Sequence, residues 1–206
     1  ASADRFDATR AVAERITMQI RGGGQRITVT SWLPDLLDLG YSTGRRISAL
    51  CALRAADVQL DVRPYGALVW RAESDKGERE SVTAIDATAR AALDRIAVDR
   101  EMGTRSRWPT SPWLFPSPVN PSRPVSKDLA SDWLERAEAL AGLPKLDGSL
   151  WHAYRRGWAT ARKHLPIADV AAVGGWKTLE VLAEVYQRPD DATSLRVVLE
   201  PRELRD

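Results

Sequence analysis

A proline-rich stretch in the middle of the chain sets the strongest limit on its fold. Residues 103–125 contain six prolines. Proline removes a main-chain donor and fixes its own backbone angle, so this stretch cannot form a long helix or a central strand. We expect a long surface connection here, which separates an N-terminal part with both helix and strand signals from a C-terminal part with helix signals.

The part before the prolines predicts helices around one small sheet. Apolar residues recur at helical spacing in several segments, which predicts helices over residues 5–20, 32–39, 44–53 and 87–102. Gly22 ends the first of these and Asp86 is the expected N-cap of the last. Alternating apolar residues between glycine-bearing turns predict three antiparallel strands, over residues 58–62, 67–70 and 81–85.

The part after the prolines predicts a helical array. Four helices are expected over residues 127–141, 149–163, 166–173 and 178–187, and an amphipathic segment follows at 192–199. The fold class is therefore mainly α with a small antiparallel β-sheet, an α+β fold. The length of 206 residues suits one large domain. We expect a helix and linker over 1–30, the domain itself over 31–190 and a tail over 191–206.

Composition excludes some classes of protein and leaves others open. No apolar run is long enough to span a bilayer, and no charged-then-apolar leader opens the sequence. The single cysteine, Cys51, excludes an internal disulfide, indicates a reducing compartment, and is expected to be a small buried hydrophobe. Residues 145–188 hold seven basic and four acidic side chains, which fits a phosphate-binding face but also ordinary solvated helices.

Six residues stand out for their chemistry: Arg46, Lys76, His152, Arg155, Trp176 and Tyr186. Each has a structural explanation when taken singly. Arg46 fits a solvated arginine, Lys76 an exposed turn, and His152 a structural histidine between aromatic residues. Trp176 fits a core position, and Tyr186 continues an apolar helical stripe. His152 and Arg155 are three residues apart and share one face of a helix.

Taken together, the six can attack a phosphodiester without a metal ion. Arginine is always charged and grips phosphate through two donors, so two arginines can hold one phosphate and stabilise its transition state. A tyrosine phenol is a suitable nucleophile, and it leaves more readily than an alkoxide when the step is reversed. Lysine and histidine can move protons, and an indole N–H can donate to a phosphate oxygen.

The local sequences around these residues, in their order along the chain, resemble the catalytic domain of the tyrosine recombinases, the phage integrase family. The similar segments are Thr43-Gly44-Arg45-Arg46-Ile47-Ser48, Ser74-Asp75-Lys76-Gly77-Glu78-Arg79, His152-Ala153-Tyr154-Arg155, Val173-Gly174-Gly175-Trp176 and Val185-Tyr186-Gln187. They are similar to the family's first-arginine box, hairpin lysine, His-x-x-Arg box, Leu-Gly-His box and nucleophile. The resemblance covers residues 30–190.

The resemblance implies a function and a set of roles. Arg46, Arg155 and Trp176 would bind the scissile phosphate, and Tyr186 would attack it to form a 3′-phosphotyrosine link. Lys76 would protonate the leaving 5′-hydroxyl, and His152 would assist proton transfer. The implied partner is double-stranded DNA, bound by a tetramer on paired sites that exchanges the 192–199 segment between protomers. It implies no metal, cofactor, membrane or small-molecule substrate, and a cytoplasmic, nucleoid-associated protein.

Two departures from the family pattern keep alternatives open. Ala49 stands where the first-arginine box usually has an acidic residue, and about 30 residues precede the match, so the family's N-terminal DNA-clamping domain is absent or was removed. The alternatives are a catalytically idle DNA-binding relative, an enzyme similar to type IB topoisomerases, and a plain helical interaction module.

Overall fold

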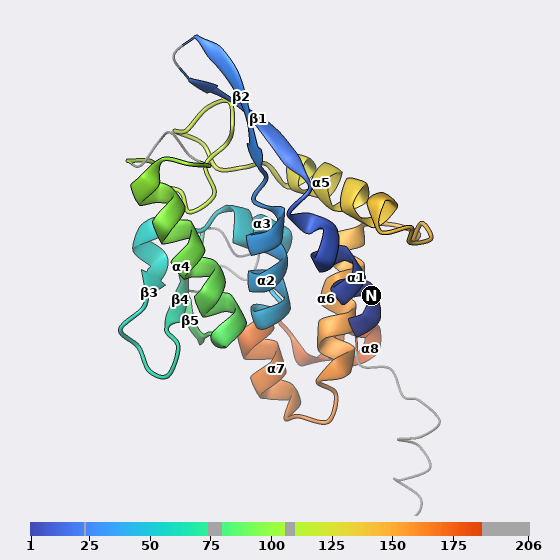
Figure 1. Ribbon diagram of the computed structural model, residues 1–206. Coiled ribbons are helices and arrows are strands. Elements are labelled where there is room, and N and C mark those ends of the chain that lie inside the picture. The colour runs from blue at the N-terminus through green and yellow to red at the C-terminus, as the bar shows by residue number, and fades with distance from the viewer. Residues whose placement is uncertain (23, 74–79, 106–109, 187–206) are drawn as a thin grey trace, which may run out of the picture.

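A computed structural model describes residues 1–22, 24–73, 80–105 and 110–186 (Figure 1). Eight α-helices and two small antiparallel sheets lie within these ranges. The predicted fold class, mainly α with a small antiparallel sheet, is confirmed, and the second sheet was not predicted. None of the helices in the described ranges is both long and apolar enough to cross a membrane.

The elements follow one another with short connections except around the prolines. The helices are α1 Ala3–Ala13, α2 Leu33–Thr43, α3 Ile47–Cys51, α4 Ala87–Met102, α5 Lys127–Leu140, α6 Leu150–Ala161, α7 Ile167–Gly174 and α8 Leu179–Tyr186, with a 3-10 turn at Ala55–Asp57. The strands are β1 Thr17–Gly22, β2 Gln25–Thr30, β3 Val58–Gln59, β4 Ala67–Trp70 and β5 Ser81–Ala84.

The N-terminal segment corrects the prediction of one helix over residues 5–20. Helix α1 ends at Ala13, and Thr17–Gly22 pairs with Gln25–Thr30 in an antiparallel ribbon, β1–β2, that projects from one end of the molecule (Figure 1). Met18 pairs with Val29, and Ile20 pairs with Ile27. These side chains share one face of the ribbon and pack on the core. Apolar residues two apart bury one face of a strand, and this period prevails over the helical spacing.

The three-stranded sheet and the helix after it are close to prediction. The strand order is β3-β4-β5, all antiparallel, although β3 ends at Gln59 instead of residue 62. Asp86 caps α4 as expected, because its carboxylate accepts a hydrogen bond from the Ala89 N–H at 2.9 Å. The described residues of the proline-rich stretch form isolated bridges and turns, as expected of a connection. The stretch is not confined to the surface, because Leu114, Phe115 and Val125 are buried in the core.

The four C-terminal helices match their predicted segments within about two residues at each end. Buried apolar residues form one large core and a smaller cluster. The smaller cluster joins α6, α7 and α8 through Trp158, Val170, Trp176 and Leu182. Cys51 is buried in the large core, as predicted, and burial raises the pKa of its thiol to about 12.

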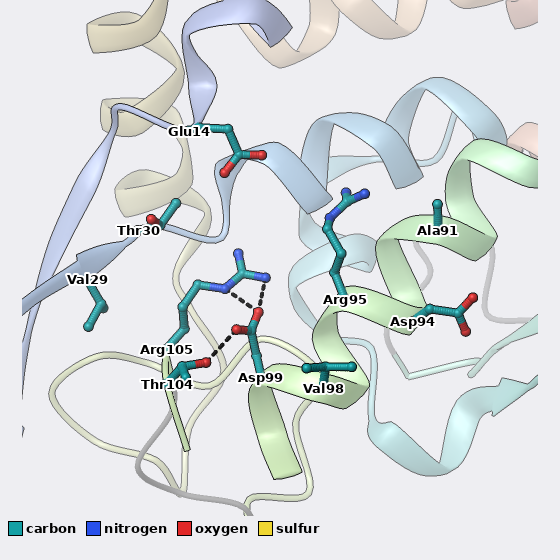
Figure 2. A pocket seen from close by; sticks show the side chains of 10 residues that line it. All are labelled: Glu14, Val29, Thr30, Ala91, Asp94, Arg95, Val98, Asp99, Thr104 and Arg105. Atoms are coloured by element: carbon teal, nitrogen blue, oxygen red, sulfur yellow. Dashed lines mark hydrogen bonds and ion pairs between the residues drawn. The ribbon is translucent and has the colours of Figure 1, made fainter. Parts of the chain in front are cut away.

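Ion pairs fasten α2 to α1 and α4. The fully buried Asp35 on α2 accepts from Arg95 at 2.9 Å and from Arg105 at 2.7 Å. An open hollow of about 850 Å³ lies beside this network, between β2 and α4. Figure 2 shows the side chains around it, with Arg105 directed at Asp99. The side chains around this hollow carry charges of both signs, and Arg95, Asp99 and Arg105 pair with acidic or basic partners, so we interpret the hollow as a structural feature.

Candidate active site

The first-arginine segment is a turn between α2 and α3. Helix α2 ends at Gly44, which adopts a left-handed conformation with φ of 63°. A Cβ atom there would lie 2.4 Å from the Trp158 ring, so both the backbone and the packing require glycine. The chain then extends through Arg46, the N-cap residue of α3. Arg45 is buried, whereas Arg46 is half-buried.

Helix α6 supplies His152 and Arg155 from neighbouring positions on one face, as their spacing predicts. Leu150, Trp151 and Trp158 on this helix are buried and fix its orientation. His152 is exposed, but the Arg155 side chain points inward and the residue is 4% exposed. Arg155 Nη1 donates to the carbonyl of Gly44 and, at 2.6 Å, to the carbonyl of Gly174.

Trp176 follows directly on the left-handed Gly175 that ends α7. Its main-chain N–H donates to the Ala171 carbonyl at 2.9 Å, and the residue is 7% exposed. The ring centroid lies 3.5 Å from Arg155 Cζ, which is a close cation–π contact. The same ring stacks on Trp158 with 6.0 Å between centroids. Trp176 is therefore a core residue, as expected, and it also contacts Arg155, a predicted catalytic residue.

The C-terminal end of α7 is the point where these residues meet. Arg46 Nη1 donates to the Gly175 carbonyl at 3.2 Å, and Arg155 donates to the adjoining Gly174 carbonyl. The end carbonyls of a helix carry the negative end of its dipole and attract cations. Guanidinium groups from the start of α3 and from α6 thus bind adjacent carbonyls, so two cations converge on the end of α7.

Two effects favour the neutral form of His152. Partial desolvation by the surrounding protein lowers the pKa of the imidazole most, and the positive charges of Arg156, Arg155 and Arg46 lower it further. A neutral imidazole at pH 7 can accept a proton. Of the six predicted residues, the structure therefore brings four together: Arg46, His152, Arg155 and Trp176.

Of the other two predicted residues, only Tyr186 lies in the described part of the chain. Lys76 lies outside the described residues, between β4 and β5. Tyr186 is the last residue of α8, a helix that packs on α6 and α7 with Leu182 fully buried. The position of its side chain is outside the description. The segment 192–199 also lies outside the described residues.

Tyr154, which lies within the His-x-x-Arg box, has a structural role. Tyr154 donates to Glu138 Oε1 at 2.9 Å and lies 2.7 Å from Thr9 Oγ1. Burial raises the pKa of its phenol. A phenol that is harder to ionise than usual, and that is held by a carboxylate, is a poor nucleophile. The geometry therefore argues against Tyr154 as the reactive tyrosine.

Arg45 is a site-related residue that the sequence interpretation passed over. It is 4% exposed, and its guanidinium binds carbonyls of α7 and hydroxyls of β5. The doublet Arg45-Arg46 is the sequence feature that could have indicated a buried arginine, because successive side chains of an extended segment point to opposite sides. One of the two arginines must therefore face inward when the other faces the site.

No group of three or more potential metal-ligating side chains occurs in the described part of the chain. No curated protein matches the sequence significantly.

Solved structures place the fold in a defined class. XerA recombinase matches 100% of this chain and 64% of its own chain at 18% identity, with a TM-score of 0.69. XerH bound to a palindromic difH substrate, in a post-cleavage complex, matches 98% and 53% at 17% identity and a TM-score of 0.70. A lambda integrase tetramer bound to a Holliday junction matches 93% and 49% at 20% identity and a TM-score of 0.62.

The fold is thus that of the site-specific recombinases, and this chain spans about half to two thirds of those solved chains. The model of the phage integrase family matches residues 19–193. The chain belongs to the phage integrase family.

Proposed function

We propose that this chain is the catalytic part of a site-specific DNA recombinase that cuts and rejoins strands through a 3′-phosphotyrosine link. The observation that carries the proposal is the convergence of Arg46 and Arg155 on the end of α7, beside His152 and Trp176. Each of these residues lies in a segment whose sequence resembles a box of the family. The rival of a plain helical interaction module offers no reason for this convergence.

Phosphate binding is the first step. A phosphate oxygen carries more charge than the Gly174 and Gly175 carbonyls that now accept from Arg155 and Arg46. Charge-assisted hydrogen bonds are about twice as strong as neutral ones, so a scissile phosphate can draw both guanidinium groups onto its oxygens. The Trp176 N–H adds a donor, and the three together stabilise the additional charge of the transition state.

Strand cleavage follows by in-line attack. The Tyr186 oxygen forms a bond to phosphorus, and the bond from phosphorus to the 5′-oxygen breaks. Neutral His152 takes the phenol proton, and Lys76 gives a proton to the leaving 5′-oxygen. A 5′-hydroxyl from another strand then attacks the phosphotyrosine and reverses the steps. The phosphodiester energy is retained, so these residues need neither a nucleotide cofactor nor a metal ion for the exchange.

The proposed partners are duplex DNA and further copies of this protein. The XerH complex with difH and the lambda integrase tetramer on a Holliday junction support this assembly by analogy of fold. We propose a tetramer on paired sites, with segment 192–199 exchanged between protomers, which places the working protein on the nucleoid.

The test is capture of the covalent intermediate. The protein is incubated with nicked duplexes of random sequence, where a nick near the cut lets the short product diffuse away, and DNA-linked protein is counted after denaturation. The natural chain should form an adduct and Tyr186→Phe should not. Tyr65→Phe, which changes an exposed tyrosine in the turn before β4, is the matched control and should form the adduct normally.

An adduct that persists in Tyr186→Phe would show that another residue is the nucleophile. Salt-sensitive DNA binding without any adduct would favour the catalytically idle relative, for which Ala49 is the sequence argument. Relaxation of supercoiled DNA without paired sites would favour the topoisomerase-like enzyme.

A further inference from the structure

Arg45 bridges two elements that the proposed mechanism needs in register. Its Nε donates to the Val173 carbonyl at 2.7 Å, and its Nη2 donates to the Ala172 carbonyl at 3.1 Å. The same Nη2 lies 3.0 Å from Ser81 Oγ and 3.2 Å from Thr83 Oγ1 on β5. One guanidinium therefore ties the last turn of α7 to the strand β5.

The bridge lies inside the protein. Arg45 is 4% exposed, and its Cζ lies 4.7 Å from the centroid of the Trp70 ring on β4. Burying a cation among carbonyls and hydroxyls costs free energy, and an apolar side chain of similar volume generally packs at least as well. Stability alone therefore gives little reason for an arginine here. Its use is the fixed geometry that several directed donors impose.

Both ends of the bridge lead to the site. On the α7 side, Val173 is three residues before Trp176. The main-chain N–H of Trp176 donates to the Ala171 carbonyl in the same turn of helix. On the sheet side, β5 follows the segment that contains Lys76. Arg46, the next residue after Arg45, binds the Gly175 carbonyl. A shift of β5 relative to α7 would therefore move the sheet relative to Arg46 and Arg155, the proposed phosphate-binding arginines.

We propose that Arg45 is a positioning residue for strand cleavage, which holds the β4–β5 sheet in register with the end of α7 so that the leaving 5′-oxygen is protonated in place. The inference rests on the proposed function. Arg45 acts through β5 and α7 and does not contact DNA itself. Replacing it should slow the chemical step while DNA binding stays close to normal.

The experiment compares two leaving groups. Nicked duplexes of the sequence captured from the random pool are made with the ordinary 5′-oxygen and with sulfur at that bridging position. A thiol has a pKa of about 8.5, so sulfur leaves as the thiolate without help from an acid. Single-turnover adduct formation, DNA affinity and thermal unfolding are measured for each variant.

We expect Arg45→Met to slow cleavage of the oxygen substrate about 10- to 100-fold, the range for a small misplacement of a reacting group. DNA affinity should change less than about threefold, because the phosphate contacts remain. The sulfur substrate should recover most of the lost rate, as it should in Lys76→Met. Ser81→Ala with Thr83→Val removes the sheet half of the bridge without touching Arg45, and should show a smaller loss with the same recovery.

Arg5→Met is the matched control. Arg5 is also a buried arginine, but it binds Glu138 and joins α1 to α5 instead of joining β5 to α7. Arg5→Met should lower the unfolding temperature. Any change in its cleavage rate should be the same for the oxygen and the sulfur substrate. Equal losses on oxygen and sulfur substrates in the Arg45 and Ser81/Thr83 variants would overturn the proposal. Absence of cleavage by the natural chain, or of sulfur recovery in Lys76→Met, would instead count against the proposed function.

Discussion

The ring of Trp176 covers the guanidinium of Arg155, with 3.5 Å between the ring centroid and Arg155 Cζ. Both side chains are almost fully buried in the DNA-free protein. The arginine is thereby held against the end of α7 before any phosphate arrives. When DNA binds, the proposed mechanism requires the guanidinium to exchange the Gly174 carbonyl for a phosphate oxygen while it stays against the indole ring.

Trp176→Phe separates the packing role of the indole from its role as a donor. The phenyl ring keeps most of the contact with Arg155 and Trp158, but it lacks the N–H. We expect adduct formation to fall about 100- to 1,000-fold, since loss of one transition-state donor costs on this order. Trp113→Phe, which removes an indole N–H that donates to the Ser122 carbonyl in the proline-rich connection, is the control and should cleave at nearly the natural rate. Normal cleavage by Trp176→Phe would show that the indole N–H has no part in the mechanism.

Gly174→Ala should displace Trp176 from Arg155. A Cβ atom at this position would lie 1.9 Å from the Trp176 ring. Alanine in a helix interior usually stabilises by up to about 1 kcal/mol over glycine, so a lower unfolding temperature would report the clash itself. We expect lower stability, altered tryptophan fluorescence and slower cleavage. A more stable variant with unchanged cleavage would contradict the importance of this contact.

The pH dependence of cleavage should reflect a neutral His152. Burial and the charges of Arg156, Arg155 and Arg46 lower its pKa below the ordinary value of 6.5. The rate should therefore hold steady from pH 8 to pH 6.5 and fall in more acidic solution, with a midpoint below 6.5, as His152 takes up a proton. The unfolded chain binds that proton more readily, so acid should also lower the free energy of unfolding.

Arg156→Gln provides the internal check on this pH profile. Arg156 is exposed and is the strongest of the three charges that lower the pKa of His152. Its removal should move the midpoint of the acidic limb to higher pH. His152→Asn should abolish that limb, and an unchanged limb in this variant would assign the titration to another group.

Glu138→Gln should test how firmly α1 is built into the domain. Glu138 Oε1 accepts from Arg5 Nε at 2.7 Å, and the pair is buried between α5 and α1. Breaking a buried pair by removing one charge costs about 3 kcal/mol or more of unfolding free energy, measurable by urea denaturation. Asp132→Asn removes an exposed pair with Arg136 on the same helix and should cost less than about 1 kcal/mol. Equal effects would mean that α1 contributes little to stability.

Local sequence predicted most of the elements and the chemistry of the site. The Asp86 cap, the β4 and β5 strands and the C-terminal helices follow from spacings of a few residues. The helix predicted over residues 5–20 was wrong beyond Ala13, because Ile16 and Ile20 fit both a helical and an alternating period. Pairing with Ile27 and Val29 on the second strand decides between the two periods, and that pairing is not visible in either strand alone.

The sequence by itself determined that His152 and Arg155 share a helical face and that Arg46 lies at the start of a helix, since neighbouring residues fix such features. The tertiary structure decided that Arg46 and Arg155 meet at the carbonyls of Gly174 and Gly175, which lie far from Arg46 along the chain. It also decided which arginine of the Arg45-Arg46 pair is buried. Convergence of this kind depends on how α2, α6 and α7 pack, and packing is a property of the whole core.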